Sequence, residues 1–225
     1  MIPVQPRIFI ITLEGNPYSE RSANRCAFSG NKYHLYMEYF DAIHKDNAIE
    51  TMEEEGLEWT WNTKDVIAGL KQFEYKTKDI RLKIACSMSH YLLWKRCVEI
   101  KKPIIILEHD AVFINPLPDL DQVKGICQLN DPTNCTPRGS WWAQQIKKKG
   151  IGVHDKTVVF NDGRPDGLAG NSAYYIKPSD ARKVIAKTKE VGLWPNDAII
   201  CRQFFKLQEV YPFVTRVMQQ QSTTV

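Results

Sequence analysis

The stretch PIIILEHDAVF, residues 103–113, decides the fold class of this chain. Its apolar residues 104–107 lead without alternation into Glu108, His109 and Asp110, after which apolar residues resume. A short, unbroken apolar run rich in isoleucine is typical of a strand that is buried on both faces of a sheet. In an open α/β sheet, ligands bind beyond the carboxyl ends of such strands. The stretch therefore predicts a buried strand that delivers two carboxylates and an imidazole to a ligand-binding edge.

A helix is predicted immediately before this strand, over residues 79–101, and Pro103 lies just beyond its end. Towards the N-terminus, RIFIITL (7–13) predicts a further buried strand, and Pro17 and Gly30 bound the helix that follows it. This order of strands and helices favours an α/β fold with a largely parallel sheet. The apolar stripe of the 79–101 helix consists of Cys86, His90, Leu93, Cys97 and Ile100.

The remaining elements are predicted from shorter patterns and from turn residues. In the strand and helix of residues 172–192, we expect Ser179 to be the helix N-cap and Gly192 to end the helix. The other predicted elements are a strand in 33–43, short helices and loops in 45–78, a strand at 125–129, a hairpin around KTVVFNDG (156–163), a short helix in 195–205, a last strand in 209–217 and a polar tail at 219–225.

Composition limits the possible classes of protein. The chain has 225 residues, 43% of them hydrophobic, which is enough for one large domain. Its net charge of +4 is too weak to argue for a nucleic-acid partner. The six cysteines form no C-x-x-C pair, which argues against a structural zinc site and favours a reducing compartment. We find no signal peptide and no apolar run of the roughly 18–20 residues that a membrane helix needs, so we expect a cytoplasmic protein.

The carboxylates after the buried strand are candidate metal ligands. Glu108 and Asp110 are separated by one residue, so both can reach one hard cation such as Mg²⁺ or Mn²⁺. Such a cation would screen a departing diphosphate. The alternative is that the two carboxylates cap the next element or pair with a lysine. His109 is a third candidate ligand, or it turns away into packing.

Three other candidates are individually weaker. His90 lies on an apolar helix stripe, where most histidines are core residues. Asp197, after Pro195 and Asn196, is a candidate general base or simply a favourable charge in a first helical turn. Arg21 on the first helix either reaches a phosphate or is solvated.

Several of these residues belong to one pattern that resembles glycosyltransferase family 25. ACSMSHYLLWKRCVEIKKPIIILEHDAVF (85–113) contains a Ser-His pair, a Leu-Trp pair and an apolar strand that ends in acids, as the central signature of that family does. The middle acid of the family pattern is His109 here. Weaker likeness extends over FIITLEGNPYSERSA (9–23), GNSAYYIKPSDARKVI (170–185), WPNDAII (194–200) and MQQQST (218–223).

The resemblance implies a GT-A fold, a single domain with a Rossmann-like mixed sheet flanked by helices. It implies that residues 1–114 bind the nucleotide-sugar, that residues 115–218 form the acceptor side and that 219–225 are a tail. It also implies an inverting transfer of a hexose, galactose or glucose, from a UDP-sugar with Mn²⁺ or Mg²⁺ as the cofactor. The resemblance implies that the metal is bound by Asp110, Glu108 and His109. It implies that the sugar donor is bound by Glu108, Ser89, His90, Arg21 and Leu13. The implied catalytic residues are Asp110 and Asp197, with Asp197 as the base.

The acceptor implied by the resemblance is a glycan such as lipopolysaccharide or a protein-linked glycan, with no nucleic-acid partner. Without a predicted membrane span, peripheral association with the inner face of the membrane is the expected location. Two other functions stay open from the residues alone. One is a metal-dependent phosphohydrolase or nuclease, which needs a further nearby ligand for a second metal. The other is a binding module that keeps the fold and holds a nucleotide or glycan without catalysis.

Overall fold

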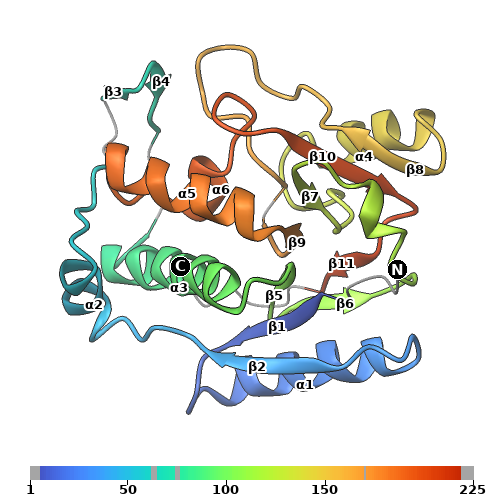
Figure 1. Ribbon diagram of the computed structural model, residues 1–225, viewed down its shortest axis with the longest axis horizontal. Coiled ribbons are helices and arrows are strands. Elements are labelled where there is room, and N and C mark those ends of the chain that lie inside the picture. Colours follow the sequence, from blue (N-terminus) through green and yellow to red (C-terminus); the bar gives the residue numbers. More distant parts are fainter. Residues whose placement is uncertain (1–5, 62–64, 74–76, 170, 219–225) are drawn as a thin grey trace.

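A seven-stranded mixed sheet runs through the middle of the protein (Figure 1). The computed structural model describes residues 6–61, 65–73, 77–169 and 171–218. The strands lie in the order β2-β1-β5-β9-β7-β10-β8, and two two-stranded ribbons, β6–β11 and β3–β4, lie outside this sheet. The strands are β1 (Arg7–Thr12), β2 (Met37–Asp41), β3 (Val66–Ile67), β4 (Leu70–Lys71), β5 (Ile104–Glu108), β6 (Ala111–Phe113), β7 (Ile126–Gln128), β8 (Gly152–Asp155), β9 (Ala173–Ile176), β10 (Leu207–Tyr211) and β11 (Thr215–Val217).

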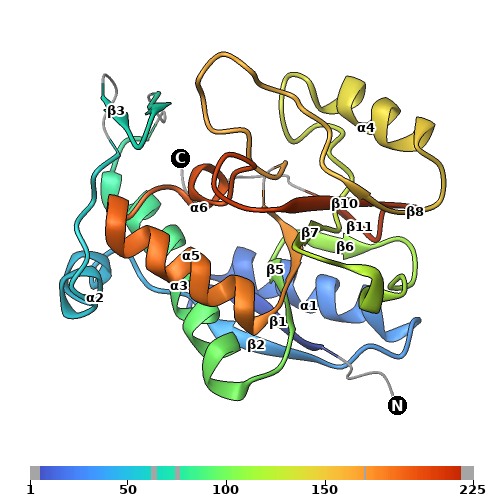
Figure 2. The same ribbon diagram turned by 45° about the horizontal axis from the view of Figure 1, so that its top comes forward.

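Helices cover both faces of the sheet. Figures 1 and 2 show α3 and α5 side by side, whereas α1 packs against β1 and β6 on the opposite face. The helices are α1 (Pro17–Asn31), α2 (Ala48–Glu54), α3 (Ile80–Ile100), α4 (Gly139–Lys148), α5 (Pro178–Val191) and α6 (Asn196–Ile199), with a 3₁₀ turn at Leu120–Gln122. The predicted α/β fold with a mixed sheet flanked by helices is confirmed.

The apolar run of β5 is buried on both faces of the sheet, as its lack of alternation predicts. Ile104 and Ile106 pack into the core beneath α3 and α5, whereas Ile105 and Leu107 pack into the core beneath α1. All four are fully buried. At about 1.5–3 kcal/mol for each fully buried aliphatic side chain, this strand alone is a large part of what stabilises the domain.

The sheet is less parallel than the strand–helix order predicts. β1 is parallel to β2 and β5, but β9 enters from the C-terminal half and lies antiparallel to both β5 and β7. The expectation of a largely parallel sheet is therefore wrong for this half. The reason is that β9 follows a long loop rather than a crossover helix, so its direction is not constrained to be parallel.

The helix boundaries follow from local capping. Asn16 accepts hydrogen bonds from the backbone N–H groups of the first turn of α1, and Asp79 does the same for α3. The prediction of Ser179 as an N-cap is wrong, because α5 begins at Pro178 and Lys177 is its N-cap. Proline suits the first helical position since it has no N–H to leave unpaired.

The predicted hairpin around residues 156–163 is also wrong. Only β8 forms in this region, and it pairs with β10, while the KTVVFNDG segment is a loop. This loop is held by the buried carboxylate of Asp166, which accepts hydrogen bonds from Lys156 Nζ at 2.7 Å and Arg202 Nε at 2.7 Å. A buried ion pair replaces the strand pairing that the β-branched residues suggest.

Other predictions differ from the structure in detail. The single last strand expected in 209–217 is two strands, β10 and β11, and Pro212 lies between them. The loop region 45–78 contains the β3–β4 hairpin as well as α2. No helix in the described part of the chain has the length and apolarity to cross a membrane. The predicted tail at 219–225 lies outside the described residues.

Candidate functional site

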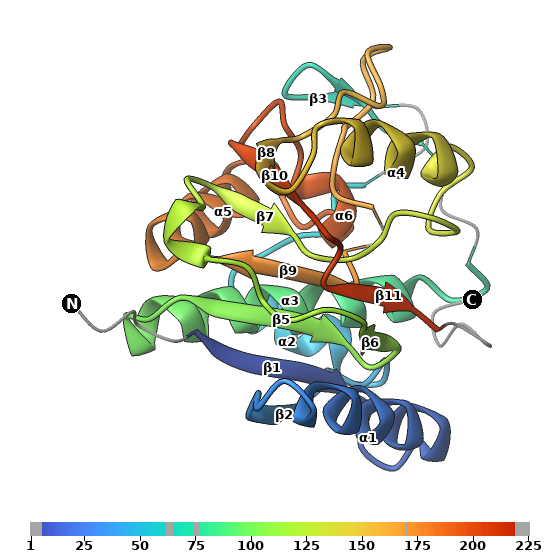
Figure 3. The same cartoon turned by 90° about the vertical axis from the view of Figure 1, so that its right-hand side faces the viewer.

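The carboxyl end of β5 meets two other elements at one edge of the sheet. Ile11 at the end of β1 is in register with Glu108, and the Glu108 N–H donates to the carbonyl oxygen of Ser172 at 2.8 Å, just before β9 begins. Figure 3 shows the β6–β11 ribbon beyond this end of β5. Leu13 and Glu108 therefore lie at the same edge, as expected for a ligand site at strand ends.

Asp110 is the most unusual charge at this edge. Its side chain is buried, and the Oδ1 atom has no hydrogen-bond partner. Burial and the neighbouring charge of Glu108 raise the pKa of the Asp110 carboxyl to about 7, against which Arg25 acts weakly. A buried carboxylate is costly unless a cation or donors compensate it. Asp110 and Glu108 thus form an oxygen-donor pair that a divalent cation would stabilise.

His109 lies in the same turn but in a packing contact. Its ring meets the ring of Tyr18 edge-on, with centroids 6.0 Å apart. Burial lowers the pKa of the His109 imidazole, and Glu108 opposes this shift. The ring is thus favoured in its neutral form. Its predicted metal role stays a prediction, and the contact that the structure gives is with α1.

The orientation of the buried His90 ring is fixed by contacts of both its nitrogen atoms. The hydroxyl of Tyr174 lies 2.9 Å from His90 Nδ1 and accepts a hydrogen bond from Trp94 Nε1 at 2.8 Å. The Nε2 atom is fully buried, lies 3.5 Å from Glu108 Oε1 and has no hydrogen-bond partner. His90 therefore joins the candidate site, and its second nitrogen points at the carboxylate.

Cys86 completes a group that the sequence analysis did not assign. One potential ligand atom from each of Cys86, His90 and Glu108 lies within 4.8 Å of the other two, the one such group of three or more in the described chain. The Cys86 sulfur donates weakly to Asn196 Oδ1 at 3.9 Å. Burial, then Glu108 and Asp197, raise the pKa of the Cys86 thiol. The spacing of Cys86 and His90, one helical turn apart on α3, was the available signal.

Two further polar residues were missed. The side chains of Asn171 and Ser172 are buried, and their polar atoms have no hydrogen-bond partner. Asn171 also has a positive φ of 49°, and both residues directly precede β9. Their sequence signals were a short polar stretch ahead of an apolar strand and the weak likeness over residues 170–185. Unpaired buried polar groups are rare and mark places where a ligand or water completes the bonding.

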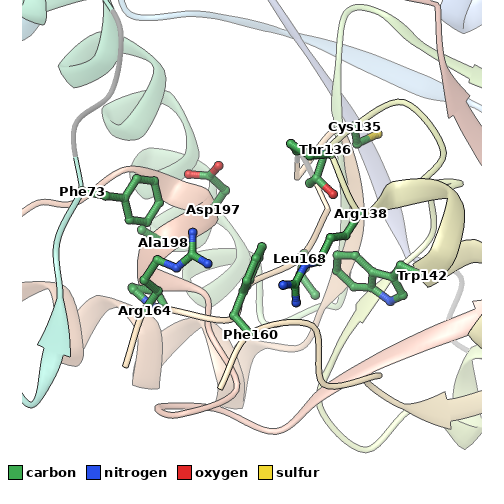
Figure 4. A pocket seen from close by; sticks show the side chains of 13 residues that line it. Phe73, Cys135, Thr136, Arg138, Trp142, Phe160, Arg164, Leu168, Asp197 and Ala198 are labelled. Atoms are coloured by element: carbon green, nitrogen blue, oxygen red, sulfur yellow. The ribbon is translucent and has the colours of Figure 1, made fainter. Parts of the chain in front are cut away.

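Asp197 lines a pocket of about 470 Å³. In Figure 4, Asp197, Phe73 and Arg164 lie on one side of this pocket, with Thr136 and Arg138 across from them. Asn196, which directly precedes Asp197 in α6, lies beside the Cys86 sulfur, with its Oδ1 atom at 3.9 Å, so this pocket adjoins the group that contains Glu108. The pocket lining also includes Cys135, Pro137, Trp142, Phe160, Pro165, Gly167, Leu168 and Ala198.

The other predicted donor-site residues have structural partners or lie outside. Ser89 Oγ accepts from the Ile43 N–H at 2.9 Å and donates to the Ala85 carbonyl at 2.8 Å. The Leu13 N–H donates to Ser19 Oγ at 2.9 Å. Arg21 is exposed on α1, and it is Arg25, one turn further along, whose charge acts on Asp110. The roles of Ser89, Leu13 and Arg21 stay predictions.

Comparison with known protein families identifies a relationship for this chain. The family model described as glycosyltransferase family 25 (LPS biosynthesis protein) matches residues 5–128. This range covers more than half of the chain and contains β1 to β7, including Cys86, His90 and the Glu108–Asp110 turn. No curated protein matches the chain.

Proposed function

The chain belongs to glycosyltransferase family 25, and on this premise we propose that it transfers a hexose, galactose or glucose, from a UDP-sugar to a glycan acceptor with inversion. Family membership makes it a transferase with a sugar donor and a glycan acceptor in general. The observation that carries the finer proposal is the buried carboxylate of Asp110, whose Oδ1 atom has no hydrogen-bond partner, beside Glu108 at the carboxyl end of β5.

The donor side of the proposal uses the β5 edge. Asp110 and Glu108 would hold Mn²⁺ or Mg²⁺, since both side chains offer the oxygen ligands that these cations prefer. The cation, when bound, stabilises the negative charge of the departing diphosphate. Asn171 and Ser172 have unpaired donors and acceptors at the same edge, and they would orient the donor by hydrogen bonds.

The acceptor side uses the 470 Å³ pocket. Asp197 accepts the proton of the acceptor hydroxyl while that oxygen attacks the anomeric carbon of the sugar. The bond from this carbon to the diphosphate oxygen breaks, and UDP leaves with the electron pair. Phe73 and Phe160 line the pocket and offer apolar faces for a sugar ring. A single base opposite the leaving group is what an inverting transfer needs.

The described part of the structure adds no observation in favour of either of the other two functions that the sequence leaves open. A two-metal phosphohydrolase needs several convergent oxygen ligands, whereas the one convergent group in the described residues contains a thiol, an imidazole and a single carboxylate. A binding module without catalysis would retain nucleotide binding and show no turnover. Measuring transfer as well as binding therefore separates it from the proposed enzyme.

For the location, the proposal is the cytoplasm, with peripheral attachment at the inner face of the membrane. All six cysteines are free thiols, as is usual in a reducing compartment. The exposed lysines at the end of α4, Lys147 and Lys148, would contact anionic lipid. Sedimentation with anionic vesicles tests the attachment, and binding that is unchanged by salt or by anionic lipid content contradicts it.

The first test of the donor is thermal melting with UDP, GDP and CMP, each with and without Mn²⁺. A ligand that binds only the folded state stabilises it by about 2.7 kcal/mol at one hundred times its dissociation constant. We expect UDP with Mn²⁺ to raise the melting temperature more than GDP or CMP does, and UDP-galactose or UDP-glucose to support transfer to a glycan. Equal shifts with all three nucleotides, or none in a folded sample, contradict the UDP-sugar assignment.

Gly167→Ala tests the catalytic role of Asp197 without changing its side chain. A Cβ at Gly167 would lie 1.9 Å from the Asp197 carbonyl oxygen, so α6 must shift. A misplacement of about 1 Å can cost about 100-fold in rate, and we expect a fall of that order in the turnover number.

The matched control is Gly125→Ala, where a Cβ would meet the Lys206 carbonyl oxygen at 2.1 Å at the start of β7 and β10. Both variants introduce overpacking that costs about 1–3 kcal/mol of stability, measured by urea unfolding. Only Gly167→Ala should lose turnover per folded molecule. Equal turnover in the two variants would remove Asp197 from the proposed base role.

A further inference from the structure

The group Cys86, His90 and Glu108 has the composition of a transition-metal site rather than a magnesium or manganese site. A thiol, an imidazole and one carboxylate favour Zn²⁺ or Co²⁺, whereas Mg²⁺ and Mn²⁺ prefer oxygen ligands. Their ligand atoms lie within 4.8 Å of one another. Two of the three residues are one helical turn apart on α3, so a rigid helix presents both.

The distances suit tetrahedral coordination. Zinc bonds of about 2.0–2.3 Å put ligand atoms about 3.3–3.6 Å apart at tetrahedral angles. His90 Nε2 and Glu108 Oε1 are already 3.5 Å apart. The sulfur of Cys86 lies within 4.8 Å of both atoms and must move closer to bind, and the partly exposed side chain of Glu108 leaves a path for the ion.

The surroundings of His90 are those of a metal ligand. Its Nε2 atom is fully buried and has no hydrogen-bond partner, although a buried polar atom without a partner is costly. The Tyr174 hydroxyl holds the other ring nitrogen and is itself oriented by Trp94. A hydrogen bond on the second nitrogen is the usual support of a metal-bound histidine.

Cys86 has a comparable support. Asn196 faces the sulfur through Oδ1 at 3.9 Å, while its Nδ2 atom is buried without a partner. Rotation of the amide exchanges these atoms and gives a thiolate an N–H donor. The thiol loses its proton when it binds a metal, and this rotation would stabilise the charge that forms.

We propose that Cys86, His90 and Glu108 form a Zn²⁺ site with three protein ligands and one open coordination position. The site shares Glu108 with the oxygen-donor pair that includes Asp110. Zinc binding therefore withdraws Glu108 from the donor edge and inhibits sugar transfer. The inhibition rests on the proposed function, whereas metal binding itself does not.

The test titrates the metal-free protein with Co²⁺ and records its absorption. One equivalent should produce a thiolate-to-cobalt charge-transfer band that Zn²⁺ displaces, with release of the thiol proton. Cys86→Ser should lose the band and bind Zn²⁺ at least about 100-fold more weakly. Cys135→Ser, a cysteine of similar exposure outside the group, should keep the band. A band that persists in Cys86→Ser, or none in the folded wild-type protein, overturns the proposal.

Two further variants separate the site from a structural role and from the transferase. Tyr174→Phe should keep the band but weaken Co²⁺ binding about 10–100-fold, the effect of removing an outer hydrogen bond; unchanged affinity contradicts the assigned geometry. Asp110→Asn should keep the band. Inhibition by Zn²⁺ should disappear in Cys86→Ser when its Mn²⁺-dependent transfer is compared with that of the same variant without Zn²⁺. Wild-type protein that shows the band but never transfers sugar would refute the proposed function and leave the zinc site standing.

Discussion

Asp110→Asn is expected to abolish sugar transfer and yet to make the metal-free protein more stable at pH 8. Loss of the proposed metal ligand would remove several kcal/mol of transition-state stabilisation, so the rate should fall about a thousandfold or more. Stability should rise because asparagine has nearly the same shape and carries no charge. The wild-type carboxylate is buried next to Glu108 and is costly when ionised.

The pH dependence of this gain follows from linkage. The Asp110 pKa is about 7 in the folded protein against 3.8 for the unperturbed group. Between these values the folded state binds more protons than the unfolded state, so the wild-type free energy of unfolding falls as the pH rises from about 4 to about 7. Asparagine removes this loss. We expect a stabilisation on the order of 1–4 kcal/mol at pH 8 that disappears near pH 4.

The measurement is urea unfolding of both proteins in chelator at pH 4, 6 and 8, together with transfer assays in Mn²⁺. Asp121→Asn, an exposed carboxylate, is the control and should change neither quantity. Added Mn²⁺ should stabilise the wild-type protein and not the variant. Wild-type transfer by Asp110→Asn would show that Asp110 does not hold a catalytic metal, and lower stability of the variant at every pH would contradict the cost of its buried charge.

Asp166→Ala is expected to cost about 3–5 kcal/mol of stability, the effect of leaving buried charges without their partner. Asp166 is fully buried and accepts from Lys156 Nζ, Arg202 Nε and the Val159 N–H. Its removal leaves the buried cation of Lys156 without its partner, next to the partly exposed cation of Arg202. The loop of residues 156–163, which contributes Phe160 to the pocket lining, would lose the hydrogen bonds to Asp166 that hold it.

The matched control is Asp162→Ala. Asp162 also pairs with an arginine, Arg164, at 2.7 Å, but both side chains are exposed, and such solvent-screened pairs contribute little to stability. The cost of Asp166→Ala should shrink between pH 7 and pH 10. Burial already lowers the Lys156 pKa, so an unpaired Lys156 can lose its proton while unfolded lysines keep theirs. Equal urea midpoints for the two variants would contradict a buried ion network.

The sequence predicts the N-terminal half of the sheet well because its signals are local. The unbroken run at 104–107 and the capped helix before it require no knowledge of distant residues. The hairpin predicted at 156–163 fails because the segment is held as a loop by Asp166, which accepts from Lys156 and from the Val159 N–H and pairs with Arg202, a residue distant in sequence. The antiparallel entry of β9 has the same cause, since no local pattern specifies a strand's neighbours.

The candidate site likewise combines residues that local sequence patterns predict with residues that only tertiary contacts bring together. The edge at Glu108 and Asp110 could be predicted, as could the helical turn that brings Cys86 and His90 to one face of α3. The absence of a C-x-x-C pair argued only against a structural zinc cluster, and the group found combines a helix with a strand end. Asn171, Ser172 and the pocket around Asp197 depend on loops whose paths are set by tertiary contacts.

The position of β9 has a consequence for how the protein is made. Ile104 of β5 pairs with Ile176 of β9, so this part of the sheet cannot close until the ribosome has added some seventy residues beyond β5. Until then, β5 and β7 expose unsatisfied edges, which is the state in which nascent chains aggregate. The candidate site at the end of β5 also depends on Ser172, which directly precedes β9 and whose carbonyl oxygen accepts a hydrogen bond from the Glu108 N–H. A growing chain therefore completes this edge of the sheet only after β9 has been synthesised and enters between the two strands.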